Sequence, residues 1–357
     1  MNKKIKVLVL GCGNMGASHA RAYHKMADFE LCGLIARTPK RRTPLAAELG
    51  GVAEFDDFGK AIAATQPDAV AICTYPDSHY KFAQQALNAG LHIFMEKPLA
   101  ETVAQAQGIV ELAAQKKRKV VVGYILRHNP AWIKFVEIAR TLGKPLVMRM
   151  NLNQQSSGAE WQTHKQLMQS MSPIVDCGVH YVDIMCQMTR SKPVLVQAIG
   201  ARLSEEIDEK MYNYGQLQVR FEDDSVGWYE AGWGPMMSET AFFVKDVIGP
   251  KGCVSIVDPG AAGTGSADID AHTKTNSLLQ HHATLDANGE LSSKDVLIDT
   301  RDEPGHQELC DREQAWFLQA IRDDLDLSEH LSDAVNSLRI VLAADESLRS
   351  GQVVRLQ

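Results

Sequence analysis

The chain opens with a strand-like run that breaks into three glycines within its first sixteen residues. Residues 4–10 are apolar apart from two lysines, Gly11, Gly13 and Gly16 follow, and a helical pattern continues from Ala17. The first glycine permits a tight turn, the second lets a pyrophosphate approach the backbone, and the third lets the helix pack close to the strand. N–H groups at the start of such a helix bind anions. The pattern predicts dinucleotide binding, with a purely structural glycine turn as the alternative.

Bulk properties exclude several other classes of protein. The 357 residues suggest two domains, and the net charge of −7 with scattered basic residues argues against a nucleic-acid partner. The apolar runs are too short to cross a membrane. The seven cysteines are odd in number and form no C-x-x-C pair, and several lie inside apolar strand patterns, as reduced core cysteines do. We therefore expect a cytoplasmic protein with neither a nucleic-acid nor a membrane partner, and we find no metal-ligand pattern.

Residues 1–123 alternate strand and helix patterns. Strands are expected at 31–36, 69–74, 91–95 and 119–123, and helices at 76–88 and 102–117, with Gly90 ending the first of these helices. The run 69–74 is continuously apolar, as in strands that are buried on both faces. This rhythm predicts a doubly wound parallel sheet, the Rossmann type of dinucleotide-binding domain.

The remainder, residues 124–357, has a different pattern. Clean alternation at 146–152 and 216–221, and strand–turn–strand patterns at 216–231 and 242–257, predict a mostly antiparallel sheet in an α+β domain. Residues 259–306 lack clear periodicity and suggest a long excursion or flap. Two amphipathic helices complete the chain, the second ending at Gly351. These C-terminal helices could pack back on the first domain.

Two short patterns carry groups suited to chemistry. Glu96, Lys97 and Pro98 lie at the carboxyl end of a parallel strand, where ligands of open α/β sheets bind. Asp176, His180 and Asp183 are spaced to form one polar stripe on a helix, and a carboxylate one turn from an imidazole can orient it as a proton acceptor. For Lys97, the alternative is a surface lysine at a strand end. For the polar stripe, the alternatives are a hydrogen-bonded helix face or, less simply, a metal site.

Taken together, these patterns resemble the glucose–fructose oxidoreductase, inositol dehydrogenase and rhizopine-catabolism (Gfo/Idh/MocA) family over nearly the full length. The motifs that carry the resemblance are the glycine turn, Thr74-Tyr75-Pro76-Asp77-x-His79, Glu96-Lys97-Pro98, Tyr124-x-x-Arg127-x-x-Pro130, Asp176-x-Gly178-x-His180-x-x-Asp183 and Ile248-Gly249-x-Lys251-Gly252. Their order along the chain is far more specific than any one of them.

The resemblance implies an NAD(P)-dependent oxidoreductase that transfers hydride between nicotinamide and a hydroxyl-bearing carbon of a sugar, cyclitol or related polyol. It implies that Lys97, Asp176 and His180 are catalytic, and that Tyr124, Arg127 and Trp161 are candidates for the substrate side together with Asp176 and His180. Trp161 could equally be a core residue. The implied cofactor-binding positions are Gly11, Gly13, Asn14, Met15, Gly16, Arg37, Thr38, Thr74, Tyr75, His79, Glu96 and Lys97.

Two departures from the family pattern bear on specificity. Met171-Ser-Pro-Ile-Val175 replaces a glycine-rich run, which affects the shape of the pocket. Ala36-Arg37-Thr38 follows the second strand, where an acid commonly accepts the ribose of NAD. Because no acid stands here, a 2′-phosphate would meet no repelling carboxylate. Arg37, Thr38 and Arg41 could bind that phosphate. NADP is therefore expected in preference to NAD, unless Arg37 only stacks on the adenine.

Two rival functions remain open at this point: redox-assisted glycoside cleavage with a retained cofactor, and a regulator that binds a nucleotide without turnover. The presence of both Lys97 and His180 argues against the regulator. One face of the second sheet should be apolar and the other polar, because Met148, Met150 and Leu152 alternate with Arg149, Asn151 and Asn153. A homodimer or homotetramer built on that sheet is expected. The alternative is that the polar face is simply solvated and the chain is monomeric.

Overall fold

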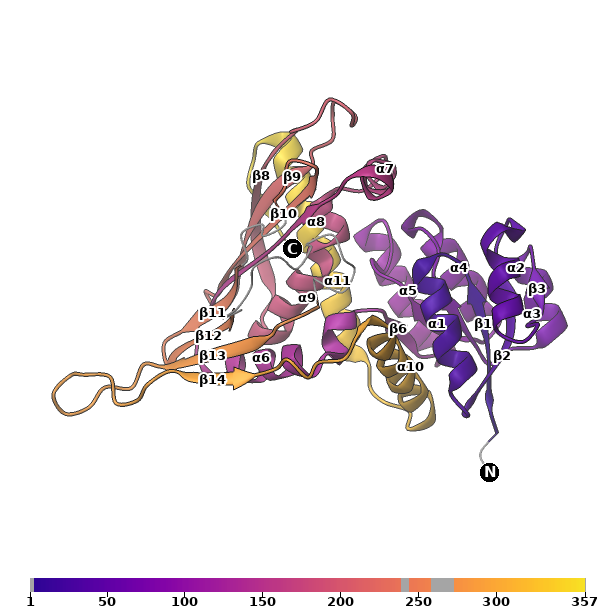
Figure 1. The fold of residues 1–357 in the computed structure, drawn as a ribbon, viewed down its shortest axis with the longest axis horizontal. Helices are drawn as coiled ribbons and strands as arrows, with labels where there is room; N and C mark the ends of the chain where they lie inside the picture. Colours follow the sequence, from indigo (N-terminus) through magenta and orange to yellow (C-terminus); the bar gives the residue numbers. More distant parts are fainter. Residues whose placement is uncertain (1–2, 239–243, 258–272, 357) are drawn as a thin grey trace. The chain divides into compact units, whose positions relative to one another are not determined.

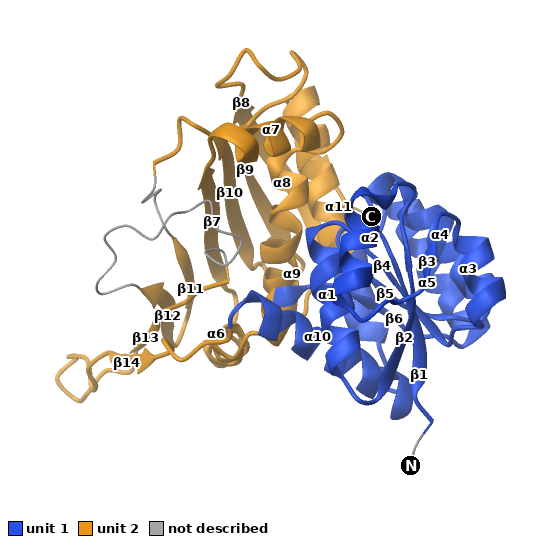
Figure 2. Ribbon diagram, turned by 45° about the vertical axis from the view of Figure 1, so that its right-hand side comes forward, with its two compact units in different colours: residues 1–125, 305–335 blue, residues 126–304, 336–357 orange. Residues whose placement is uncertain are grey.

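The computed structural model describes residues 3–238, 244–257 and 273–356. These residues form two compact units, 1–125 with 305–335 and 126–304 with 336–357 (Figure 2). The first unit therefore includes a segment from near the end of the chain. Within the described part of the chain, no helix is both long and apolar enough to cross a membrane.

The first unit, which begins at the indigo end of the chain in Figure 1, is built on a six-stranded parallel sheet in the order β3-β2-β1-β4-β5-β6. Its strands are β1 (Ile5–Leu10), β2 (Phe29–Ile35), β3 (Glu54–Phe55), β4 (Ala69–Ile72), β5 (His92–Met95) and β6 (Val120–Val122). Every residue of β4 is fully buried, as expected for a strand covered on both faces. The strand order reverses between β1 and β4, which is where open α/β sheets bind their ligands. The predicted doubly wound sheet is confirmed.

Helices of the first unit follow the strands along the chain. They are α1 (Asn14–Lys25), α2 (Pro39–Glu48), α3 (Phe58–Thr65), α4 (Pro76–Asn88), α5 (Val103–Lys116) and α10 (His306–Arg322). Gly90 adopts φ +78° just beyond α4, and the Thr102 hydroxyl accepts a hydrogen bond from the Gln105 N–H at the start of α5. The late helix α10 packs against α1, the helix of the glycine turn. Thus the last third of the chain supplies part of the Rossmann unit.

The second unit contains a nine-stranded sheet in the order β14-β13-β12-β11-β7-β10-β9-β8-β15. Its strands are β7 (Val147–Gln155), β8 (Pro193–Ala201), β9 (Tyr214–Phe221), β10 (Val226–Gly234), β11 (Lys245–Gly249), β12 (Gly252–Val257), β13 (Ser277–His282), β14 (Val296–Asp299) and β15 (Val354–Arg355). Only the central pair β7 and β10 is parallel, and the other pairs are antiparallel. The predicted mostly antiparallel sheet is confirmed.

One face of this sheet is covered by helices of the same unit. Helix α6 (Pro130–Thr141) packs on β11–β13, and α8 (Pro173–Asp176) and α9 (Gly178–Thr189) pack on β10. The remaining helical elements are η1 (Ile125–His128), α7 (Gly158–Leu167) and α11 (Ser328–Ser350), of which η1 and α11 each have residues in both units. On the opposite face, Val147, Val226 and Ile248 form one row across three paired strands and are each about 40% exposed.

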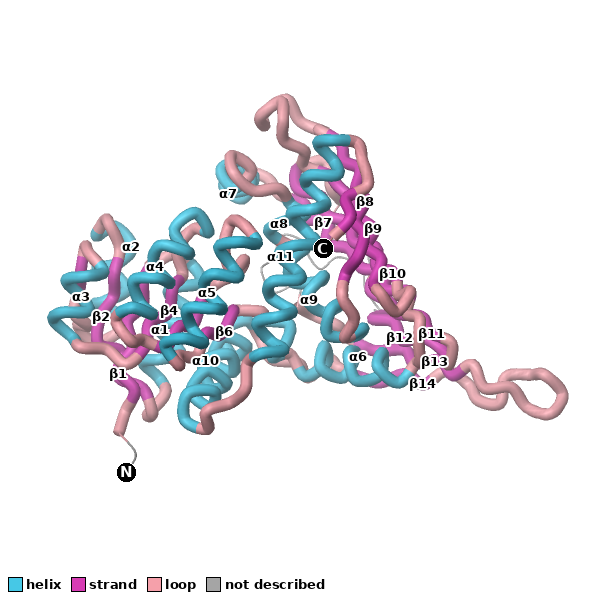
Figure 3. The backbone as a smooth tube through the Cα atoms, turned by 180° about the vertical axis from the view of Figure 1, so that it is seen from behind, coloured by secondary structure: helices cyan, strands magenta, loops and turns pink. Residues whose placement is uncertain are grey.

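Two sequence expectations for this unit need correction. The segment 259–306 is more than an excursion, because β13 and β14 extend the sheet and, of its described residues, the loop 283–295 projects from it (Figure 3). Their weak amphipathic pattern hid them, since the residues of β14 are largely exposed. Residues 258–272 lie outside the described part. In β7, Asn151 is buried together with Met150, so the strict alternation ends there.

Candidate active site

The glycine turn between β1 and α1 is sterically dictated. Gly11 adopts φ +100°, and a Cβ atom there would lie 2.4 Å from the Cys73 carbonyl oxygen. A Cβ atom on Gly16 would lie 1.9 Å from the Gly11 carbonyl oxygen, so the helix can approach the strand only without a side chain at this position. Gly13 is the N-cap of α1 and offers no side chain to its first N–H groups, which belong to Asn14, Met15 and Gly16. The turn has the features that a pyrophosphate requires.

The end of β2 presents positive charge beside this turn. Arg37 and Thr38 are exposed where α2 begins, and Arg41 donates a hydrogen bond of 3.4 Å to the Asn14 side chain. Arg42 is engaged differently, because its guanidinium binds Glu54 and two backbone carbonyl groups. Arg37, Thr38 and Arg41 are therefore available to a cofactor phosphate, whereas Arg42 braces the loop.

The loop after β4 carries Thr74 and Tyr75. Tyr75 is 59% exposed, and the Ser78 hydroxyl donates a hydrogen bond to the Thr74 hydroxyl. His79 lies beneath this loop, fully buried, with one ring nitrogen 2.8 Å from the Pro98 carbonyl oxygen and the other 3.0 Å from the Thr74 carbonyl oxygen. Burial lowers the pKa of His79, although the two carbonyl groups favour the protonated ring. In this structure His79 links the loops that carry Thr74 and Lys97.

Glu96 and Lys97 directly follow β5. Glu96 is buried and lies 2.7 Å from the Nε2 atom of His19, which projects from α1. Burial disfavours the carboxylate, but the hydrogen bond from His19 and the positive charge of Lys97 outweigh it, so the pKa of Glu96 is lowered. The Lys97–Pro98 peptide bond is cis. His19 was not among the predicted site residues; its signal in the sequence was a polar residue three positions after Gly16 on the buried face of a helix.

In the second unit, the predicted polar stripe is divided between two helices. Asp176 ends α8, while His180 and Asp183 lie in α9. Cys177 between them keeps helical dihedral angles, so Asp176 and His180 remain about one turn apart. His180 is 8% exposed. Asp183 differs in role, because its carboxylate binds Arg127 through two hydrogen bonds of 2.6 and 2.8 Å.

The residues predicted for the substrate side are mostly enclosed. Tyr124 is 1% exposed, and Arg127 directs two of its donors to Asp183. Trp161 is 6% exposed, donates a hydrogen bond to Glu206, and packs in a core cluster with Trp233 and Cys177. This environment favours the core alternative for Trp161.

A further group beside Asp176 was missed. The His164 ring stacks on Trp233 with a centroid separation of 4.4 Å, and burial lowers the pKa of His164 to about 4, opposed by the charge of Asp176. The Gln154 side chain accepts a hydrogen bond from the Trp233 indole. Sequence spacing contained no signal for this cluster, because its members come from β7, α7 and β10.

These features define a protein class: a Rossmann unit with a pyrophosphate-type glycine turn and a following Glu–Lys pair, joined to a unit with an Asp–His pair on a helix. Comparison with known families matches residues 5–124 to the model described as "Oxidoreductase family, NAD-binding Rossmann fold" and residues 138–253 to the "GFO/IDH/MocA C-terminal domain". The chain belongs to the GFO/IDH/MocA oxidoreductase family.

Individual relatives agree with this assignment. The chain is 28% identical to D-glucoside 3-dehydrogenase of Escherichia coli (strain K12), over 89% of this chain and 93% of that protein. It is 27% identical to UDP-N-acetylglucosamine 3-dehydrogenase of Acidithiobacillus ferrooxidans, over 56% of this chain and 59% of that protein. The structure of scyllo-inositol dehydrogenase from Lactobacillus casei with bound NAD(H) and scyllo-inositol has the same fold, with a TM-score of 0.78, 21% identity and 99% of both chains covered.

Proposed function

We propose that this protein transfers hydride between the nicotinamide of NAD(P) and a hydroxyl-bearing carbon of a sugar, cyclitol or related polyol. The observation that carries the proposal is the glycine turn, in which Gly11 and Gly16 leave no space for a Cβ atom, in a chain that matches both halves of an oxidoreductase family. The relatives named above act on a glucoside, a UDP-sugar and a cyclitol, which supports this substrate class.

Three residues are proposed to carry the chemistry. In the oxidative direction His180 accepts the hydroxyl proton, Asp176 orients the His180 ring, and Lys97 hydrogen-bonds the reacting oxygen and stabilises its developing charge. The position of Asp176 about one helical turn before His180 supports the pairing. The nicotinamide supplies the hydride acceptor when it is bound. Tyr124 and Arg127 remain candidates for the substrate side.

NADP is the proposed preferred cofactor. The absence of an acid at Ala36 and the exposed Arg37, Thr38 and Arg41 beside the glycine turn support this preference, because they offer positive charge and no carboxylate to a 2′-phosphate. The proposed cofactor set also includes Thr74, Tyr75, His79, Glu96 and Lys97.

The proposed assembly is a homodimer or homotetramer that uses the face of the second sheet opposite α6, α8 and α9. The exposed row of Val147, Val226 and Ile248 on that face supports the proposal, since neighbouring exposed apolar side chains commonly mark partner sites. A cytoplasmic location is proposed as well. It is supported by the seven cysteines, all of them described residues and none of them in a disulfide.

The decisive experiment is a screen of sugars, sugar nucleotides and cyclitols with NAD and with NADP, followed by the absorbance of the reduced cofactor. Stoichiometric release of reduced cofactor is expected for a dehydrogenase. Cleavage of a glycoside without net cofactor reduction would favour redox-assisted glycoside cleavage instead. Cofactor binding without turnover on any substrate would favour a nucleotide-binding regulator.

A further inference from the structure

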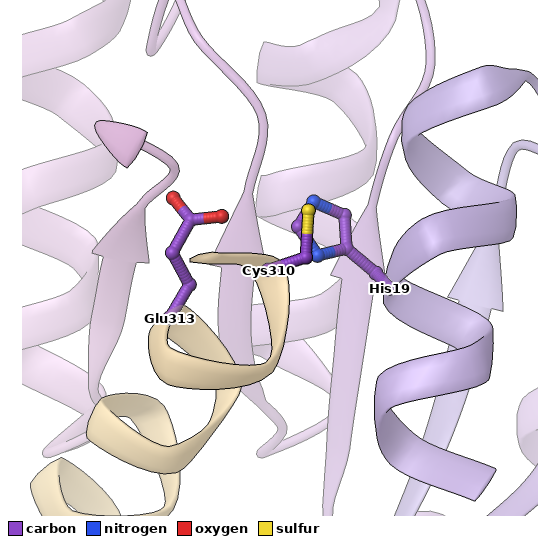
Figure 4. A group of neighbouring side chains, drawn as sticks. All are labelled: His19, Cys310 and Glu313. Carbon is purple, nitrogen blue, oxygen red and sulfur yellow. The ribbon is translucent and has the colours of Figure 1, made fainter. Parts of the chain in front are cut away.

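A buried group of polar side chains lies where α10 packs on α1. Figure 4 shows His19 on one helix and Cys310 and Glu313 on the other, and the possible ligand atoms of the three lie within 4.8 Å of one another. All three side chains are buried. Imidazole, thiolate and carboxylate together form a donor set that suits zinc, so the first question is whether these residues hold a metal ion.

The hydrogen bonds of His19 argue against a metal. Its Nε2 atom lies 2.7 Å from the Glu96 carboxylate, and its Nδ1 atom lies 2.9 Å from the amide nitrogen of Gln314. Both ring nitrogens are therefore already engaged, and a metal could bind His19 only by displacing one of these partners. The arrangement has the character of a hydrogen-bond chain.

The hydrogen bonds of this group form one consistent chain when the Glu96 carboxylate accepts and the Tyr23 hydroxyl donates. A Glu96 carboxylate can only accept, so the His19 Nε2 atom must carry a proton. A lone pair on Nδ1 matches the amide N–H of Gln314, whose nitrogen lies 2.9 Å away. The Gln314 carbonyl oxygen in turn accepts the hydroxyl proton of Tyr23. With the Tyr23 hydroxyl as donor, the Gln314 amide presents its N–H group to Nδ1 and the His19 ring carries its proton on Nε2.

Glu313 shows where the negative charge of the group resides. It is 1% exposed, and neither carboxyl oxygen has a hydrogen-bond partner among the residues that the structure describes. Burial, and then the charge of Glu96, raise the pKa of Glu313 well above its ordinary value. Burial therefore favours the neutral acid at Glu313, whereas the hydrogen bond from His19 favours the carboxylate at Glu96.

The result for Glu96 is a carboxylate that is held at one oxygen. His19 occupies Oε1, and among the described residues none donates a hydrogen bond to Oε2. The side chain is 9% exposed, so part of it reaches the surface of the unit at the carboxyl end of β5, next to Lys97. A carboxylate held this way can accept hydrogen bonds from a ligand hydroxyl group without reorienting.

We propose that His19, oriented by Gln314 and Tyr23, is a positioning residue that holds the Glu96 carboxylate for a ribose hydroxyl of the nicotinamide cofactor. The inference rests on the proposed function, because it assigns Glu96 to the cofactor. It adds that helix α10, more than 200 residues away in the sequence, takes part in shaping the cofactor site of the Rossmann unit.

The test compares two substitutions at His19 with one at Cys310, a residue of the same buried group. His19→Leu removes both hydrogen bonds, whereas His19→Gln keeps an N–H donor near the position of Nε2. We expect the dissociation constant and the KM for NAD(P) to rise about tenfold in His19→Leu and to recover most of the way in His19→Gln. The KM for the polyol should change less than twofold. Cys310→Ala, a change in the same packed group, should leave the cofactor constants unchanged.

Three results would overturn the proposal. The first is an equal loss of cofactor affinity in Cys310→Ala and His19→Leu, which would indicate a packing effect. The second is a metal ion bound stoichiometrically to the purified protein and lost in Cys310→Ala. The third is a His19 ring protonated on Nδ1 alone in ¹⁵N NMR spectra of the wild-type protein, a measurement that needs no variant to fold. Dissociation constants from cofactor fluorescence require no turnover, so failure of the proposed activity is distinguishable from failure of this inference.

Discussion

Arg127 and Asp183 form a buried ion pair that ties η1 to α9. The guanidinium donates from Nε and Nη2 to the two carboxylate oxygens, at 2.8 and 2.6 Å, and the side chains are 12% and 1% exposed. Such a two-point pair fixes both the position and the rotation of its partners. It holds the helix that carries His180 to the segment that begins the second unit.

Breaking this pair should destabilise the protein strongly. Asp183→Asn removes the carboxylate charge that pairs with the buried guanidinium, and we expect the free energy of unfolding to fall by about 3 kcal/mol or more. The exposed pair Arg220–Asp224, whose side chains are 58% and 68% exposed, serves as the control, and Asp224→Asn should cost less than about 1 kcal/mol. Urea denaturation measures both. If the two variants lose the same free energy of unfolding, the Arg127–Asp183 pair contributes little to the stability of the fold.

Cofactor preference should depend on position 36. Wild-type protein is expected to bind NADP more tightly than NAD, and Ala36→Asp should flatten or reverse the preference, because a carboxylate repels the 2′-phosphate and accepts the ribose hydroxyl. Ala47→Asp adds the same charge on an exposed position of α2 and should leave the preference unchanged. The dissociation constants of NADP and NAD, measured for the wild type and both variants, test the prediction. A wild-type preference for NAD would contradict it.

The catalytic assignments predict large losses of turnover with little loss of cofactor binding. Lys97→Ala and His180→Ala should each lower kcat by ~10²-fold or more, the scale of acid–base catalysis. His24→Ala and Lys116→Ala, at exposed positions of α1 and α5, are matched controls that should retain full activity. If His180→Ala stays within a few-fold of wild type, His180 is part of a hydrogen-bonded helix face.

Lys245 should make stability depend on pH. It is 1% exposed in β11, its ammonium lies 5.4 Å from the centre of the Tyr181 ring, and burial lowers its pKa from 10.5 to about 7. Between these two values the unfolded chain binds more protons than the folded one, so this group makes stability rise with pH.

Substitution of Lys245 tests that dependence. Lys245→Met should be more stable than wild type at pH 7, and its advantage should shrink by about 2 kcal/mol at pH 9. Lys251→Met, at an exposed position in the turn between β11 and β12, should show no such change. Denaturation curves at the two pH values measure the difference. An advantage that does not vary with pH would mean that Lys245 is charged in the folded protein.

The proposed assembly predicts a mass above that of one chain. Light scattering at micromolar concentration should give a multiple of 39.3 kDa, and Val226→Lys should shift it toward the monomer, because a charge enters the exposed apolar row. Ile133→Lys, on an exposed position of α6, is the control. A wild-type mass near 39.3 kDa would end this proposal.

Local patterns predicted the first unit well because the residue pattern of each of its elements indicates how that element is buried. A continuous apolar run such as β4 is needed wherever helices cover both faces of a strand, and Gly90 ends α4 through a backbone conformation that other residues avoid. The division at residues 123 and 124 stays a prediction. Strands β13 and β14 escaped prediction because few of their residues are buried, which leaves little periodicity to detect.

The sequence by itself determined the glycine turn, the parallel sheet, the family, and the Lys97 and Asp176–His180 patterns, since each depends on residues close together in the chain. Tertiary structure alone decided which polar groups meet. His19 contacts Glu96 and Gln314 from 77 and 295 positions away, and Arg127 meets Asp183 across 56. Hydrogen bonds act over about 3 Å in space, whatever the separation along the chain. The packing of α10 on α1 was therefore needed to show that His19 binds Glu96 through one ring nitrogen and Gln314 through the other.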